Sequence, residues 1–390
     1  MNRFPLLAAL CAITAACSPG APGALQTVVT DSAGVAIVTA QSLDRLPARS
    51  LTGPLLDLPT SQDSSDASFS RVGAVLRLSD GRVIVADGAS RRLKVFASDG
   101  TYLRTLGGPE GDATELMAIT AIWPAGRNRI VAFDRRQRSL FTLNLDGGPV
   151  EFAEIAIPPG NPRAVGRLAS GHVLVRSLLI DVPETGFDLT DIAITRYHAD
   201  GSLADTVGIW PSARMGRLGQ PPVQLVSSPM FEPRVVGAAA GDRLLVTDCR
   251  TPEYRVIDPQ RGLESVVRWP ATQDSVTEDD VRSFRARRLD PLGPEQQGQV
   301  RAFLDDMPIN TTMPACDQLR IDSDGRAWVR TYLRPAAPLQ RWLVFDSSGG
   351  PVFSVDLPAE SRIMDINSDY VTVIERRPLD VPRVRVYGIE

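Results

Sequence analysis

Three aspartates in the sequence end short apolar runs that resemble one another. If these runs are equivalent strands of a radial repeat, the three carboxylates lie around one rim and could hold a hard divalent cation such as calcium. Arginines follow each aspartate closely, so an ordinary turn with local Asp–Arg pairing is the alternative. A metal site is therefore kept only as an alternative interpretation of these positions. The runs are Arg82–Asp87, Arg129–Asp134 and Arg243–Asp248.

Positive charge gathers in the same segments. Apart from Lys94, all of the 42 basic residues are arginine. The loops that join the second and third strands of each repeat unit would open on one face of a ring, where guanidinium groups could bind carboxylates or phosphates. This pattern predicts an arginine-rich mouth that suits an anionic ligand, and an ordinary solvated rim is the alternative. The candidate binding residues are Asp87, Arg91, Arg135, Arg176, Asp248, Arg250, Glu253, Arg330, Tyr332 and Arg376.

The familiar sequence patterns of catalysis are missing. There is no G-x-S-x-G segment, no His-Glu-x-x-His, no Cys-x-x-Cys and no glycine-rich phosphate loop. The chain has two histidines, His172 and His198, and both fall at expected turns, where a solvated side chain is favoured over a catalytic base. These observations favour a binding module over an enzyme.

The elements that position these residues belong to a repeat of about 45 residues. Residues 73–106 divide into four short strands, with Asp-Gly turns at 80–81 and 99–100. Asp-Gly between apolar runs is a strong hairpin signal, because glycine accepts the positive φ that such turns need. The first turn of the unit recurs at Gly81, Gly126, Gly171, Gly241, Gly325 and Ser368.

A four-stranded unit at this spacing is typical of a β-propeller blade. The expected fold is all-β: a six-bladed propeller over residues 31–390, with blades starting near residues 69, 120, 163, 231, 314 and 361. The last blade has three strands, so the strand Gly34–Ala40 is expected to complete it and close the ring. A helical insert is expected at about 275–308, between blades four and five, with Thr277 as N-cap and a second helix opening at Pro294. This insert is expected to pack on the rim, and a lid or partner-docking role is the alternative.

The N-terminus has the pattern of an export signal over residues 1–16. Arg3 precedes an apolar run, Phe4–Ala16, that is too short to span a bilayer. The end of this run, Thr14-Ala-Ala-Cys17, resembles the lipobox of bacterial lipoproteins, although Thr14 stands where that family has Leu, Val or Ile. The resemblance implies that Cys17 is lipidated, that residues 17–30 form a tether and that lipid is the only membrane contact. A plain secretory signal is the alternative.

Composition and cysteine count narrow the possibilities further. The chain has 390 residues, 43% of them hydrophobic, as in ordinary globular proteins. With 46 acidic residues and a formal charge of −4, it lacks the basic footprint of a nucleic-acid-binding protein. Cys249 and Cys316 would remain after removal of the signal. They could pair in an oxidising compartment, or they could be two separate strand-end residues.

Residues 80–107, DGRVIVADGASRRLKVFASDGTYLRTLG, resemble an NHL repeat. Over nearly all of the mature region the chain resembles the six-bladed propeller lipoproteins of environmental bacteria. The resemblance implies the fold and export to the periplasm or outer membrane, and it brings no catalytic residues. NHL-type propellers bind proteins, peptides or RNA, and broadly similar propellers include metal-dependent lactonases and lyases.

The function expected from the sequence is therefore binding or scaffolding through the arginine-rich mouth, by a lipid-anchored monomer without catalysis of its own. The expected partner is an envelope protein, a peptide or an anionic small molecule, with no cofactor and no nucleic acid. The alternative is a propeller enzyme, a metal-assisted lactonase, hydrolase or lyase, in which Asp87, Asp134 and Asp248 hold a divalent cation at the axis.

Overall fold

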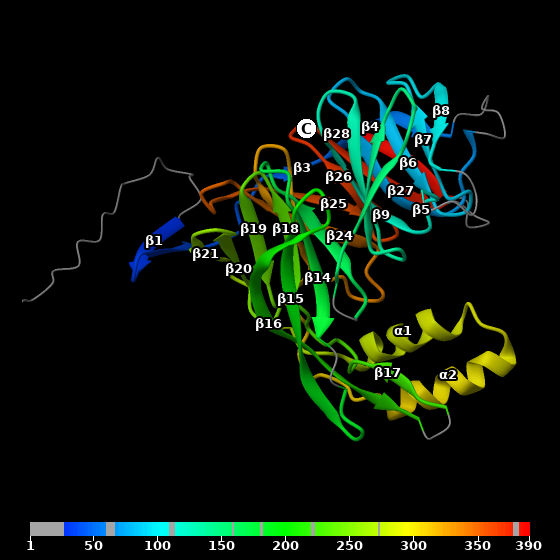
Figure 1. The fold of residues 1–390 in the computed structure, drawn as a ribbon. Helices are drawn as coiled ribbons and strands as arrows, with labels where there is room; N and C mark the ends of the chain where they lie inside the picture. The colour runs from blue at the N-terminus through cyan, green and yellow to red at the C-terminus, as the bar shows by residue number, and fades with distance from the viewer. Residues whose placement is uncertain are drawn as a thin grey trace, which may run out of the picture.

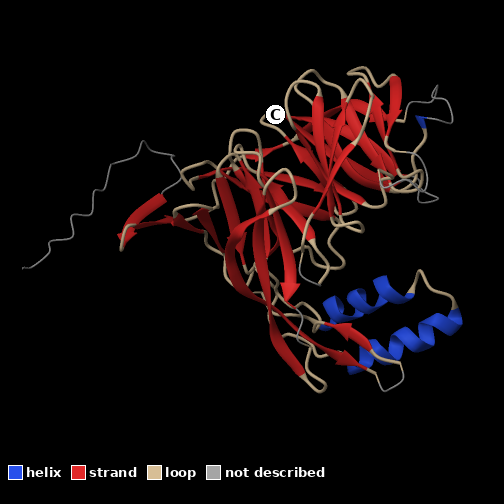
Figure 2. Ribbon diagram, in the orientation of Figure 1, coloured by secondary structure: helices blue, strands red, loops and turns tan. Residues whose placement is uncertain are grey.

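The computed structural model describes residues 27–59, 67–108, 114–157, 160–179, 182–219, 223–271, 274–376 and 382–390. The expected signal, Cys17 and most of the expected tether lie outside these residues. Figure 1 shows strands over most of the chain, arranged as a β-propeller, and Figure 2 shows the helices together at one side of it. No helix among the described residues is long and apolar enough to cross a membrane.

The clearest repeat unit forms the four antiparallel strands expected from its pattern. They are β5 (Val72–Arg77), β6 (Val83–Asp87), β7 (Arg92–Phe96) and β8 (Tyr102–Leu106). Gly81 and Gly100 have φ of +88° and +91°, the left-handed conformation that the turns of this unit require. Every residue of β6 is buried, as befits a strand inside a sheet that is covered on both faces.

The same order of strands recurs along the chain. The second unit has β9 (Ile119–Pro124), β10 (Arg129–Asp134), β11 (Ser139–Asn144) and β12 (Glu151–Glu154). The third has β13 (Arg163–Arg167), β14 (Val173–Leu179), β15 (Phe187–Tyr197) and β16 (Leu203–Leu218), with β17 (Leu225–Ser227) added to the end of β16. The fourth has β18 (Val236–Ala240), β19 (Arg243–Thr247), β20 (Glu253–Asp258) and β21 (Gly262–Arg268).

The C-terminal units complete the series. One has β22 (Cys316–Ile321), β23 (Ala327–Thr331), β24 (Leu339–Phe345) and β25 (Pro351–Pro358). The last has β26 (Arg362–Ile366), β27 (Tyr370–Arg376) and β28 (Pro382–Ile389).

The hydrogen bonds do not divide the strands into six sheets, one for each of the six expected blades. The described strands form five sheets, one of them with eleven strands. The merger has a local cause: Gly166 of β13 and Ala239 of β18 form a parallel bridge that joins the third and fourth units. A Cβ at Gly166 would lie 1.9 Å from the Ala239 carbonyl oxygen, so glycine permits this close approach.

Successive units are held together by buried apolar clusters. Leu58, Phe69, Val83 and Val384 belong to a cluster that joins the last unit to the first. Each of the other five pairs of consecutive units, from the first and second to the fifth and last, has a cluster of its own between them. Because no sheet covers both of its own faces, this stacking provides the hydrophobic core of the described residues.

The expectation for the N-terminal strand is wrong in its position. Residues 34–40 do not complete the last unit. Strand β2 (Val35–Ala40) pairs with β21 on the fourth unit, and β1 (Thr27–Ser32) covers its outer edge. Strand β3 (Ala48–Arg49) pairs with β25, and β4 (Leu51–Leu58) adds the fourth strand to the last unit beside β28. The N-terminal segment therefore lines the outer edges of three successive units, which covers strands that would otherwise be exposed.

Two helices lie between β21 and β22. Helix α1 (Glu278–Leu289) begins at Thr277, which forms a capping box with Asp280. Helix α2 (Pro294–Asp306) starts at its proline. Figure 1 places both helices beside the ends of β16 and β17. There Phe303, Leu304 and Met307 pack with Leu218 and Met230 in a cluster separate from those between the units.

Cys249 and Cys316 are joined by a disulfide, with their Cα atoms 5.0 Å apart. Cys249 follows β19 and Cys316 opens β22, so the bond links the fourth unit to the fifth. Both cysteines are buried in the cluster between these units.

Candidate functional site

Asp87 and Asp134 accept hydrogen bonds from the loops around them and so stabilise those loops. Asp87 is buried and accepts hydrogen bonds from the backbone N–H groups of Ser70, Arg71, Ala89 and Ser90 at 3.1–3.2 Å. The Ser90 hydroxyl donates a further bond at 2.6 Å. Burial alone would raise the pKa of Asp87, but these donors outweigh it and hold the pKa below its ordinary value.

Asp134 plays the same part in the second unit. Its carboxylate is fully buried and accepts from the N–H groups of Met117, Ala118, Arg136 and Gln137 at 2.6–3.0 Å. Each aspartate thus joins the loop after its own strand to the loop that enters its unit. The carboxylate oxygens are committed to backbone donors, which is a structural role.

Asp248 differs from the other two. It is half-buried and accepts one bond, from the Arg250 N–H at 2.9 Å. Within the described part of the chain, no three or more His, Cys, Asp or Glu side chains are grouped so that they could hold a metal ion. The structure therefore does not bring Asp87, Asp134 and Asp248 together as the alternative interpretation required.

Several predicted binding residues are already paired with acidic groups. Arg91 bonds Glu115 at 2.8 Å, Arg250 lies 3.7 Å from Glu232, and Arg330 makes two bonds to Asp317 at 2.6 and 2.9 Å. Glu253 pairs with Arg268 at 2.9 Å. The side chain of Arg376 lies outside the described residues, although its backbone pairs with Pro382 in the last unit. For these four paired residues, the solvated rim with local pairing describes the observed contacts.

Two other predicted arginines belong to a different environment. Arg135 donates to the Asn161 side-chain oxygen at 3.2 Å, and Arg176 donates to the Val235 carbonyl at 3.3 Å. Both acceptors are neutral, so neither contact neutralises a guanidinium charge. Each acceptor is close in the chain to a further arginine. Asn161 is two residues before Arg163, and Val235 directly follows Arg234.

Strand register places two of these arginines side by side. Arg163 of β13 and Arg176 of β14 are direct cross-strand partners, so their side chains leave the same side of the sheet. Neither Arg163 nor Arg234 has an ion pair or a side-chain hydrogen bond with any described residue, and both are exposed. We refer to Arg135, Arg163, Arg176 and Arg234 as the arginine cluster. It gathers four positive charges, and none of them is paired with a carboxylate of a described residue.

The electrostatics of the arginine cluster follow from this crowding. Burial lowers the pKa of Arg176 to about 10, with further lowering by the charges of Arg163 and Arg234. Partial desolvation by its neighbours also lowers the pKa of Arg163, although the side chain is exposed, and repulsion from Arg135 and Arg234 lowers it further. Like charges that share a partly desolvated surface disfavour one another, whereas an anion placed among them would relieve the repulsion.

Helix α1 and the fifth unit border this cluster. Arg288 of α1 stacks over the Phe284 ring, with its guanidinium carbon 3.4 Å from the ring centroid. Burial raises the pKa of Tyr332 to about 12. The charges of Arg288 and Arg234 both act on Tyr332 in the opposite direction and lower its pKa. The Tyr332 ring lies 6.4 Å from that of Phe231. The predicted residue Tyr332 is thus a largely apolar neighbour of the arginine cluster.

The first strands of the units contact one another in sequence, and their side chains carry further charge. Arg320 of β22 donates to the Ile363 carbonyl of β26 at 3.4 Å, and burial and the charge of Arg362 lower its pKa. Asp365 of β26 accepts from the Arg77 N–H at 3.0 Å. Burial raises the pKa of Asp365 to about 6. The first strands of the units therefore carry more arginines than acidic residues.

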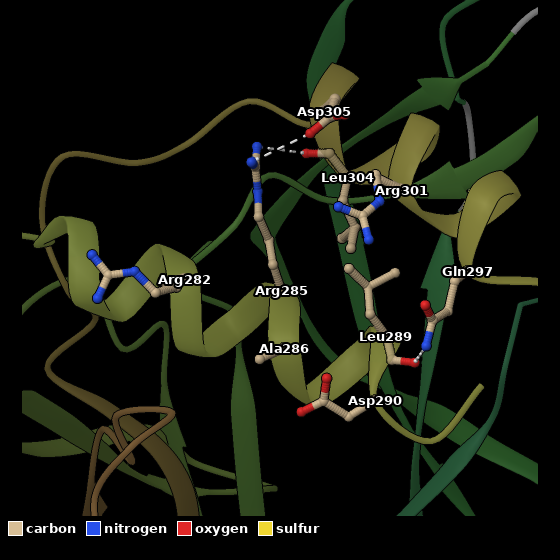
Figure 3. A pocket seen from close by; sticks show the side chains of 9 residues that line it. All are labelled: Arg282, Arg285, Ala286, Leu289, Asp290, Gln297, Arg301, Leu304 and Asp305. Atoms are coloured by element: carbon tan, nitrogen blue, oxygen red, sulfur yellow. Dashed lines mark hydrogen bonds and ion pairs between the residues drawn. The ribbon is translucent and has the colours of Figure 1, made fainter. Parts of the chain in front are cut away.

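A pocket of about 340 Å³ lies between α1 and α2, and none of the predicted site residues lines it (Figure 3). Arg285 spans the pocket and contacts Asp305 at 3.3 Å and the Leu304 carbonyl at 3.3 Å. Gln297 donates to the Leu289 carbonyl at 3.1 Å. The polar groups in view thus tie the two helices to each other.

The two histidines lie on the face of the propeller opposite the arginine cluster. Their ring centroids are 4.6 Å apart, and Ser170 Oγ is 2.8 Å from His172 Nδ1. His198 is exposed and His172 is half-buried. Both are turn residues, as the sequence predicted, but their contact with each other was not foreseen.

Comparisons with solved structures give likenesses over most of the chain. A member of the DUF4221 family from Bacteroides vulgatus has 8% identity and a TM-score of 0.47, covering 86% of this chain and 96% of its own. A streptogramin B lyase has 11% identity and a TM-score of 0.42, covering 86% and 96%. Regucalcin, a calcium-binding protein from Agrobacterium tumefaciens, has 9% identity and a TM-score of 0.41, covering 88% and 96%. No family model matches the chain, and no curated protein matches it at a significant level.

Arg163 and Arg234 are not among the predicted binding residues, because those residues came from the loops between second and third strands. Arg163 opens a first strand, and Arg234 lies in the segment that leads into the next unit. In a unit of four antiparallel strands, these segments lie on the same face as the loops that were searched. Including every segment of that face would have found both residues.

Proposed function

We propose that this protein binds an anionic ligand through the arginine cluster. The observation that carries the proposal is the missing counter-charge: Arg163 and Arg234 have no acidic partner among the described residues, and Arg135 and Arg176 donate to neutral oxygens. The chain has more acidic than basic residues, and many of its arginines form ion pairs. A cluster left unpaired in such a chain supports an external anion as its partner.

The ligand class follows from the donors. Each guanidinium offers planar paired N–H groups that match carboxylate or phosphate oxygens. Several cations grouped together suit a ligand with more than one anionic group, such as a carboxylated peptide, a glycan acid or a phosphorylated solute. Arg288 and Tyr332 would border such a ligand and offer it an aromatic edge.

The test is isothermal titration of the purified protein with inorganic phosphate, citrate, a uronic acid and an acidic tripeptide. At least one of these probes is expected to bind, and glucose is expected to give no signal. Charge-assisted hydrogen bonds contribute about 1.5–3 kcal/mol. Arg163→Gln and Arg234→Gln should therefore each weaken binding by roughly 10–100-fold.

Arg127→Gln is the matched control. Arg127 is exposed, has no ion pair with a described residue and lies in the turn between β9 and β10, on the opposite face of the ring. Its replacement should leave anion binding unchanged. Equal weakening by Arg127→Gln would show a general charge effect and overturn the proposal. Binding of none of the four probes, or binding insensitive to both cluster variants, would also overturn it.

The proposal includes a closed ring of six blades. Its support is the chain of apolar clusters that joins each unit to the next and the last to the first. In this interpretation the eleven-stranded sheet is two blades connected by the bridge at Gly166. The Asp-Gly turns and buried β6 support an NHL-like first blade, and α1 with α2 form an insert between the fourth and fifth blades.

The proposal also places the protein in the cell envelope. The apolar run Phe4–Ala16 and the lipobox-like end at Cys17 support export followed by lipid attachment. The disulfide between Cys249 and Cys316 fits an oxidising compartment. The protein would then act there as a monomeric binding module, with an anionic solute, peptide or envelope protein as partner.

A further inference from the structure

The chain has two histidines, and the fold brings them together. His172 directly precedes β14 and His198 directly follows β15, and the adjoining residues Val173 and Tyr197 are cross-strand partners. Continuing this antiparallel register by one residue sets the two histidines opposite each other on the same side of the sheet. The contact between their rings, with centroids 4.6 Å apart, agrees with that placement.

The nitrogens of this pair are available to a ligand. Ser170 Oγ lies 2.8 Å from His172 Nδ1, which engages that nitrogen and leaves Nε2 for another partner. A hydrogen bond of this kind also fixes the orientation of a ligating imidazole. Neither ring nitrogen of His198 has a hydrogen bond to a residue that the structure describes. Solvent reaches both rings, because His198 is exposed and His172 is half-buried.

We propose that His172 and His198 form a binding site for a divalent late transition-metal ion, with Cu²⁺ and Zn²⁺ as the ions that suit it. Imidazole nitrogen is a preferred ligand of both. Two imidazoles that hold one ion at about 2.0–2.1 Å need ring centroids roughly 5 Å apart, close to the observed separation. The separation of the two rings is therefore compatible with one shared ion.

The rest of the coordination sphere would come from water. The described residues contain no group of three or more His, Cys, Asp and Glu side chains suited to a metal. The nearby Asp205 carboxylate is held by Arg196 at 2.5 and 3.0 Å, and one Asp200 oxygen accepts from the Ser202 N–H and hydroxyl. The site would thus have two protein ligands, and its remaining positions would be open to water or to a ligand from a partner.

The test is calorimetric titration of the protein, prepared without a histidine tag, with Cu²⁺, Zn²⁺ and Ca²⁺. One Cu²⁺ per chain is expected, with Zn²⁺ binding more weakly and Ca²⁺ not at all. His172→Gln and His198→Gln should each weaken Cu²⁺ binding at least tenfold, and the double variant should abolish it. Arg127→Gln, in a turn on the same face, should bind as the wild type does.

A second measurement separates this site from adventitious binding. In NMR spectra, the ring signals of both histidines should broaden together as substoichiometric Cu²⁺ is added. Broadening of one ring alone, wild-type affinity in either single variant, or one bound Cu²⁺ per chain in the double variant would each overturn the proposal. Anion binding at the arginine cluster should be unchanged in these variants, so this inference can fail independently of the proposed function.

Discussion

At the scale of single residues, position in the repeat did not decide what an aspartate does. Asp87, Asp134 and Asp248 stand at equivalent places, yet the first two are surrounded by backbone donors and the third accepts a single bond. The difference comes from the loop that enters each unit. Residues 117–118 and 70–71 approach Asp134 and Asp87, and this approach cannot be seen in the sequence of either strand.

Replacing Asp134 with alanine should destabilise the protein strongly. The change leaves four N–H groups without their acceptor in a buried site, and the expected loss in the free energy of unfolding is about 3 kcal/mol or more. Urea denaturation would measure it. Asp242 is exposed, and its side chain has no partner among the described residues. Asp242→Ala should therefore change the free energy of unfolding by less than about 0.5 kcal/mol. A loss at Asp134 no larger than in this control would contradict the structural role.

Asp87 should contribute to the acid sensitivity of the fold. Its folded pKa is below the ordinary value of 3.8, so the folded state binds this proton less readily than the unfolded state. The stability that its carboxylate provides is therefore present above about pH 4 and lost as pH falls through the lower folded pKa. Unfolding free energies measured from pH 6 down to pH 2.5 should fall less steeply in Asp87→Asn. An unchanged slope would show that Asp87 does not couple protonation to folding.

At the scale of elements, local pattern predicted the units and failed at their connections. The strands between Asp-Gly turns, such as β6 and β7, follow from alternation and turn chemistry, which act over a few residues. Which unit an N-terminal strand joins depends on partners more than two hundred residues away. The segment Leu51–Leu58 contains Pro54, which argues against a central strand but is compatible with the outer edge that β4 occupies.

Closure of the last unit by β4 gives a test with an internal control. Leu58 is fully buried in the cluster between the last and first units, whereas Leu55 on the same strand is 59% exposed. Leu58→Ala should lower the free energy of unfolding by about 2–5 kcal/mol. Leu55→Ala should lower it by less than about 0.5 kcal/mol. Similar effects of the two changes in thermal or urea unfolding would show that β4 does not seal the ring.

At the scale of the whole molecule, the candidate site is a property of assembly. Arg163 and Arg176 meet through strand pairing, Arg234 arrives from the segment before β18, and Arg135 comes from a different sheet. The sequence predicted an arginine-rich mouth and named two of these four residues. Whether any of the four is paired depends on every acidic side chain that folding brings near it, and local sequence does not show this.

The arginine cluster should lower the stability of the protein when no ligand is bound. Four guanidinium groups repel one another, and salt screens repulsion between exposed charges over about 10 Å at 0.1 M. The double variant Arg163→Gln/Arg234→Gln should therefore melt at a higher temperature than the wild type in low-salt buffer, and the difference should shrink as sodium chloride is raised to 0.5 M. Arg127→Gln should show neither effect. A site kept for binding an anion is expected to trade stability in this way, and an anion that binds it should restore the lost stability in the wild type alone. A double variant that melts lower than the wild type at every salt concentration would mean that these arginines support the fold through contacts of their own.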